Sequence, residues 1–169
     1  MARASDYFRG SQATNPVGYR LLRVLRWDGI PDLPSREGNR TPFLPPSESY
    51  RTRLEIAQGS GAWSDLLTAC EEIFYEVPNH FWLDVQRFAD QALGGLGPDH
   101  AATRRLLRHE VARLLERLPG IEDLAFSDGT AFADPATRDW LEREIRTLSA
   151  GGGASAPRRR RRTTRWRSC

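Results

Sequence analysis

A series of apolar runs at helical spacing restricts the fold of this chain more than any other feature, because each run ends at proline or glycine. Within a run the apolar side chains fall at positions i, i+3, i+4 and i+7, which places them on one face of a helix. The sequence has no strand-length runs that alternate polar and apolar residues between hairpin turns. We therefore predict an all-α fold. The clearest runs cover residues 62–77, 81–96 and 102–118.

Capping residues predict where the other helices begin. Asn15-Pro16 predicts a helix start, because Asn accepts hydrogen bonds from the free N–H groups of the first turn and proline is favoured at the first helical position. Ser47 predicts a second start, and Asp134-Pro135 predicts the start of the final helix. The total is about six helices, which we expect to pack as antiparallel, hairpin-like pairs. Between the first two lies a proline-rich segment, residues 30–46, which we expect to be an ordered or semi-ordered crossing loop.

Charge divides the chain into a mildly acidic body and a basic end. Residues 1–150 carry 18 arginines against 22 acidic residues, whereas residues 151–169 carry seven arginines and no acid. The composition changes abruptly at the end of the last apolar run to glycine, alanine and serine and then to arginine, which is typical of a linker and a disordered tail. We predict a lead-in at 1–14, a helical domain at 15–148, and the linker and tail at 149–169.

The basic tail has two interpretations. Its arginines could neutralise phosphates while a tryptophan stacks on a base, so that the chain would be a small helical module that binds nucleic acid. Alternatively, a GC-rich gene read out of frame gives arginine, glycine, alanine and proline, and every basic residue here is arginine. Of the explanations for such a tail, we rank specific nucleic-acid binding lowest. The residues concerned are Arg158, Arg159, Arg160, Arg161, Arg162, Arg165, Trp166 and Arg167.

The sequence contains no recognisable catalytic or metal-binding constellation. Cys70 and Cys169, with three histidines, do not suffice for a disulfide framework or a zinc site of the usual spacing. His109-Glu110 begins a zinc-protease motif, but Arg113 stands where the second histidine should be. Cys70 lies on an apolar helix face and is expected to fill core space. We expect no enzyme activity, no cofactor, no metal and no membrane insertion, since no apolar run approaches the roughly 20 residues needed to span a bilayer.

Several charged residues within the helical runs have structural explanations. Glu71, Glu72 and Glu76 are expected to form a solvated face, and His80 and His100 to be surface or capping residues. Asp84 and Arg87 stand among large apolar residues, three positions apart on one helix, where two side chains can touch. The preferred interpretation is an ion pair that fixes helix register, with Arg20 or Arg23 as other candidate partners; the alternative is a binding hot spot.

Several segments spread over residues 15–145 form a pattern through their order and spacing. They are Asn15-Pro16 with Tyr19, Arg23 and Trp27; Leu33-Pro34, Thr41 and Pro45-Pro46; Trp82 to Arg87, including Asp84; Leu96-Gly97; and Phe126 to Asp134, including Asp128 and Phe132, followed by Thr137 and Trp140. Taken together, these segments resemble the TssA family of bacterial type VI secretion, which includes ImpA- and VasJ-like proteins. Ala131 departs from the family pattern, which usually has proline there.

The resemblance implies a non-enzymatic scaffold domain that forms a homodimer and works with the type VI baseplate, tube and sheath proteins, without a small-molecule substrate. The cytoplasmic location that we expect follows instead from residues 1–10, which contain no apolar signal segment. It also implies that this chain corresponds to the middle helical domain only, a truncated form without the family's N-terminal and ring-forming domains. From the residues themselves, Trp82 and Trp140 are expected mainly inside the domain. Tyr19, Arg23 and Trp27 are the expected contacts between elements or with a partner.

Overall fold

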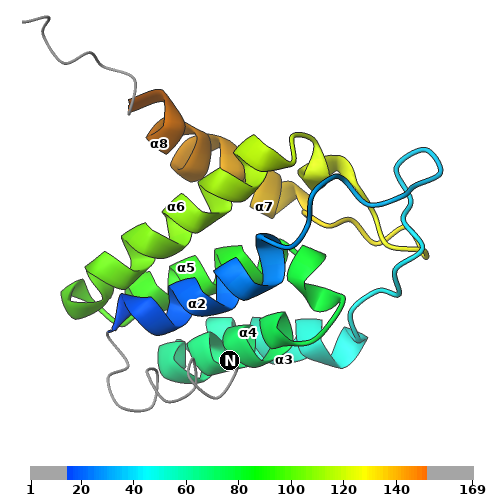
Figure 1. Cartoon of the computed structure of the whole chain (residues 1–169). Helices are drawn as coiled ribbons and strands as arrows, with labels where there is room; N and C mark the ends of the chain where they lie inside the picture. The colour runs from blue at the N-terminus through cyan, green and yellow to red at the C-terminus, as the bar shows by residue number, and fades with distance from the viewer. Residues whose placement is uncertain (1–14, 152–169) are drawn as a thin grey trace, which may run out of the picture.

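The computed structural model describes residues 15–151, and this part of the chain contains six helices (Figure 1). This confirms the prediction of an all-α fold. The last helix is continuous but contains a π turn, named η4, between its two α-helical parts. The helices are α2 (Pro16–Trp27), α3 (Glu48–Gly59), α4 (Trp63–Tyr75), α5 (Asp84–Gly95), α6 (Ala101–Arg117) and the last helix, which comprises α7 (Pro135–Trp140), η4 (Leu141–Ile145) and α8 (Arg146–Gly151). Three short 3-10 turns join them: η1 (Asn79–Phe81), η2 (Pro98–His100) and η3 (Ile121–Asp123).

Two of the predicted helix starts have the expected caps. The Asn15 side chain accepts a hydrogen bond from the Val17 backbone N–H at 3.0 Å, and proline occupies the first position of α2. The Asp134 side chain accepts from the Thr137 backbone N–H at 2.6 Å, and proline again follows. Ser47 precedes α3 as predicted, but its side chain does not bond to the first turn. Its hydroxyl contacts that of Ser49 instead, at 2.8 Å.

The helices α3, α4, α5 and α6 run in alternating directions, each packed against the next (Figure 1). This arrangement confirms the antiparallel pairing expected from the short connections. Helix α2 packs against α6 and also reaches α4, where the ring of Trp27 meets that of Phe74 edge-on at a centroid distance of 5.1 Å. None of the helices within residues 15–151 is both long and apolar enough to cross a membrane.

The helix predicted from residue 81 begins three residues later, at Asp84. The apolar residues before it belong instead to η1 and to a short link, where the Leu83 backbone N–H donates to the Phe132 carbonyl at 2.7 Å. Apolar spacing alone did not reveal this, because the bond joins segments about fifty residues apart. The connection between α4 and α5 is therefore longer than the two or three residues that the sequence suggested.

The proline-rich segment 30–46 is an ordered crossing, as expected. It lies beside the segment that precedes α7, and backbone hydrogen bonds join the two. Thr41 N–H donates to the Ala125 carbonyl at 2.8 Å, Ala125 N–H donates to Asn39, and Ser127 N–H donates to Phe43. These bonds fix a loop that contains no helix of its own.

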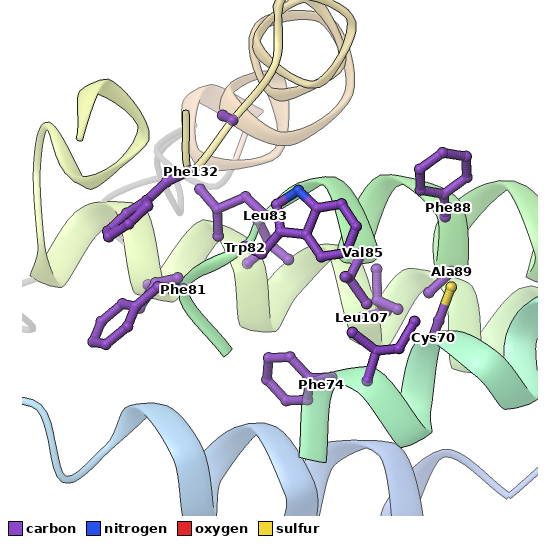
Figure 2. Close-up of a cluster of buried hydrophobic side chains, with 14 of the residues drawn as sticks. Cys70, Phe74, Phe81, Trp82, Leu83, Val85, Phe88, Ala89, Leu107 and Phe132 are labelled. Atoms are coloured by element: carbon purple, nitrogen blue, oxygen red, sulfur yellow. The ribbon is translucent and has the colours of Figure 1, made fainter. Parts of the chain in front are cut away.

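The core lies between α4, α5 and α6 and extends under the crossing segments (Figure 2). Cys70 and Phe74 of α4 lie in it with Val85 and Phe88 of α5, and all four side chains are buried. Phe132 joins the same core from the segment before α7, with its ring stacked on that of Phe81 at a centroid distance of 5.5 Å. The core therefore holds the segment before α7 against the start of α5.

Candidate functional site

The Asp84 carboxylate is the centre of a buried polar network at the start of α5. One oxygen accepts hydrogen bonds from the Thr137 hydroxyl at 2.7 Å and the Asp134 backbone N–H at 2.9 Å. The other accepts from the Trp82 indole N–H at 2.8 Å and from the Arg51 guanidinium at 3.1 Å. With four hydrogen-bond donors, one of which is the Arg51 cation, a fully buried carboxylate is tolerated. Asp84 thereby joins α3, α5 and α7.

The preferred interpretation of Asp84 and Arg87 as a direct ion pair is wrong. Arg87 pairs with Asp134 at 3.1 Å, whereas the cation beside Asp84 is Arg51, so Arg20 and Arg23 are not its partners either. The Thr137 hydroxyl connects the two groups, because it donates to Asp84 and accepts from the Arg87 Nε–H at 2.9 Å. Periodicity within one helix did not reveal these partners, because they come from other helices.

Asp134 has two structural roles in this network. Burial raises the pKa of its carboxyl, but hydrogen bonds from Thr137 and the positive charges of Arg87 and Arg51 outweigh burial and hold the pKa below its ordinary value. It therefore stays charged, so that it caps α7 and balances Arg87 at the same time. The dipeptide Asp134-Pro135 predicted the helix cap from the sequence, whereas nothing in the sequence indicated the pairing with Arg87.

Arg23 of α2 forms a second buried network. Its guanidinium donates to both carboxylate oxygens of Glu71, at 3.0 and 2.7 Å, and to the Gln86 side-chain oxygen at 3.1 and 3.0 Å. It also donates to the Tyr19 carbonyl at 3.0 Å. Glu71 is only 4% exposed, so the expectation that it belongs to a solvated acidic face is wrong. A cation on a neighbouring helix makes its burial tolerable.

Tyr19, Arg23 and Trp27 form contacts between elements, which was one of the two roles expected for them. Their exposed fractions are 3%, 1% and 2%. The Trp27 indole N–H donates to the His80 carbonyl at 3.0 Å, which ties α2 to η1. These side chains are inside the domain and therefore do not form part of a surface for a partner.

Asp90 of α5 is the centre of a third network. Arg104 and Arg108 of α6 both contact its carboxylate through two nitrogens, at 2.6 to 3.0 Å. Burial raises the pKa of Asp90, but hydrogen bonds from these arginines outweigh it and hold the pKa below its ordinary value. The Trp140 indole N–H donates to the same carboxylate at 3.2 Å. Trp140 and Trp82 are therefore inside, as expected, and each bonds to a buried carboxylate.

Asp128 and Phe132 belong to the turn before α7 and differ in role. Asp128 is exposed and accepts from the Thr130 backbone N–H and hydroxyl, both at 2.8 Å, and these bonds lower its pKa. Gly129 between them has a φ of 95°, which an L side chain rarely adopts. Phe132 is fully buried. Asp128 and Gly129 therefore hold this turn, with alanine at position 131.

The remaining chemically interesting side chains do not meet in a reactive site. His80 is only 8% exposed, which corrects its expected surface position, and burial together with the nearby Arg26 lowers its pKa to about 4. Cys70 is fully buried, and burial raises the pKa of its thiol, consistent with a role in the core. Within residues 15–151 no group of histidine, cysteine and acidic side chains is arranged to hold a metal ion. The tail arginines and Trp166 lie outside the described residues.

The outer face of α2 carries apolar side chains that the core does not cover. Val17, Leu21, Val24 and Leu25 form one stripe along this helix, at the helical spacing noted for apolar residues. Val17 is 48% exposed and Leu25 42%, and the two between them are partly exposed. The opposite face of α2 carries Trp27 and its buried neighbours. We call the four outward residues the α2 stripe; its apolar character is visible in the sequence, but its outward direction is not.

Comparison with known proteins agrees with the resemblance seen in the sequence. A search of curated proteins finds no match for this chain. A family model described as "Type VI secretion, EvfE, EvfF, ImpA, BimE, VC_A0119, VasJ" matches residues 1–168. That match covers the whole helical domain and all three buried networks. The chain therefore belongs to the ImpA and VasJ family of type VI secretion components.

Proposed function

We propose that this protein is a non-enzymatic, cytoplasmic assembly component of the type VI secretion system, which associates with itself and docks its partners through the α2 stripe. Family membership supports a place in the secretion apparatus. The three buried networks join α2, α3, α4, α5, α6 and α7 through carboxylates that already have cationic and hydrogen-bonding partners. Residues used in this way stabilise a scaffold, and they are not free to react with a substrate.

The α2 stripe is the observation that carries the proposal. Apolar side chains that follow one helix face and stay half-exposed are typical of an interaction surface. Beside the C-terminal end of α2, the last residue of α4 and the segment after it expose two further side chains, Tyr75 at 45% and Val77 at 67%. Arg26 connects the two elements: it donates to the Tyr75 carbonyl, and its guanidinium lies over the Tyr75 ring at 4.7 Å. A stable dimer buries about 800 Å² on each partner, so the stripe would be the apolar centre of a larger contact with a polar rim.

Sedimentation equilibrium of the full chain tests self-association. We expect the unaltered chain to form a dimer and Leu25→Glu to weaken the dimer at least about tenfold, because a charge in an apolar contact loses its hydration. Leu44→Glu is the matched control, since Leu44 is 72% exposed and lies in the crossing segment. A monomer at every concentration, or equal dissociation constants for the two variants, would refute the proposed use of the stripe.

Partner docking needs its own experiment. We propose that the baseplate, tube and sheath proteins of the same secretion system contact this domain. Purified partners should bind the full chain and lose binding with Leu25→Glu while binding Leu44→Glu normally. If both variants bind equally, partner docking uses another surface.

A further inference from the structure

An open groove runs along α3 and the start of α4. It encloses about 760 Å³, and its lining includes Ile56, Ala57 and Ala62. Ile56 is 67% exposed, so an apolar side chain points into open space rather than into the core. The groove is separate from the α2 stripe and from the three buried networks.

The lining of the groove has more unpaired negative charge than unpaired positive charge. Glu48 and Asp65 both line it, and among residues 15–151 neither carboxylate has an ion-pair or hydrogen-bond partner. The cation present, Arg53, is already paired with Glu72 at 2.8 Å. The groove therefore fits a segment that combines large apolar side chains with positive charge.

The chain enters α2 at the same end of the bundle as this groove. Arg23 pairs with Glu71, and four residues further on Trp27 meets Phe74, so α2 and α4 run in the same direction. The first residue of α2 lies about 10 Å before Arg23, and the first residue of α4 lies about 12 Å before Glu71, at 1.5 Å per residue. The start of α2 is therefore level with the turn between α3 and α4, as Figure 1 shows.

The residues that precede α2 have the composition that the groove fits. Tyr7 and Phe8 stand side by side, Arg3 and Arg9 flank them, and Asp6 is the single acid in residues 1–14. Fourteen residues reach as far as about 45 Å when extended. That length is ample to lead back from the start of α2 along α3.

We propose that residues 1–14 dock in the α3–α4 groove of the same chain. In this arrangement the aromatic pair covers Ile56, and the flanking arginines lie against Glu48 and Asp65. Burial of two aromatic rings supplies apolar contact, and the arginines compensate carboxylates that have no cation in the rest of the domain. The first fourteen residues would then complete the outer face of α3 and α4.

A spin label near the N-terminus tests this docking in the full chain. The label is attached at Ala4→Cys in a Cys169→Ser background, since the remaining thiol, Cys70, is buried. We expect the amide signals of residues 56–62 in the isotope-labelled chain to lose more than half of their intensity when the label is oxidised. Broadening restricted to the start of α2 would overturn the proposal.

Three variants in the same labelled chain make the test specific. Phe8→Ser and Ile56→Asp should restore the signals of the groove, and Leu44→Asp, at an equally exposed apolar site, should leave the broadening unchanged. If neither Phe8→Ser nor Ile56→Asp has an effect, the proposed contact is wrong. A mixture of spin-labelled chains without isotope and isotope-labelled chains without spin label should show no broadening; broadening there would assign the groove to a second copy and overturn docking within one chain.

Discussion

Replacing Asp84 with asparagine removes the charge at the centre of the first network while keeping the size of the side chain. The carboxylate accepts two donors on each oxygen, from Thr137 and Asp134 on one side and Trp82 and Arg51 on the other. Asparagine has one acceptor oxygen and one donor NH₂ group. Whichever way its amide turns, two donors lose their acceptor and face another donor.

The cost follows from the burial of these groups. Each buried donor left without an acceptor costs about 1–3 kcal/mol, so we expect Asp84→Asn to lower the free energy of unfolding by about 3 kcal/mol. For a domain of this size, that loss corresponds to a fall of about 6–12 °C in melting temperature. Urea denaturation, followed by tryptophan fluorescence and circular dichroism, measures the free energy of unfolding. The matched control is Asp99→Asn, because Asp99 is exposed.

The reasoning fails if Asp84→Asn unfolds within about 1 kcal/mol of Asp99→Asn. A double-mutant cycle sharpens the test. Thr137→Val removes the hydroxyl that donates to Asp84, so the double variant should lose less than the sum of the two single losses. Additive losses would show that Asp84 and Thr137 do not act in one network.

Three further predictions concern other buried groups. The pKa of His80 is about 4 in the folded protein against 6.5 ordinarily, so the unfolded chain takes up the proton first as the pH falls. The free energy of unfolding should therefore be highest above pH 6.5 and decrease towards pH 4 by at most about 3 kcal/mol, which urea denaturation at a series of pH values measures. His80→Gln should remove this contribution to the pH dependence. Trp140→Phe removes the hydrogen bond to Asp90 and should cost about 1–2 kcal/mol in the same assay; no measurable loss would contradict the bond's contribution. In Cys169→Ser, Cys70 should react with a thiol reagent at pH 8 only as fast as the domain unfolds, since burial both shields the thiol and raises its pKa; rapid reaction in the folded state would show otherwise.

Local signals predicted most of the helices correctly. Asn15-Pro16 and Asp134-Pro135 mark helix starts because a cap acts over two or three residues, and the structure shows both bonds. The predicted start of α5 was wrong because the backbone N–H of Leu83 donates to a segment far away in the sequence. Sequence periodicity contains no information about such a bond.

The partners of the buried charges could not be predicted for the same reason. Glu71 stands next to Glu72 in the sequence, yet one is buried beside Arg23 and the other is largely exposed beside Arg53. Neighbouring positions on a helix point about 100° apart, so one step along the chain separates core from surface. Deciding which acid is inside requires knowing where α2 packs.

The π turn in the last helix has a consequence for tolerance of length changes. Leu141–Ile145 contains one residue more than an α-helical turn would. It stands between α7, whose Thr137 and Trp140 bond to residues of α5, and α8, which contacts α6 as the π turn itself does. A deletion of one residue inside this turn can be absorbed by a return to α-helical geometry. The same deletion in the middle of α6 would rotate every later core residue away from its neighbours. The last helix can therefore lose one residue without displacing its core side chains, whereas the central helices of the bundle cannot.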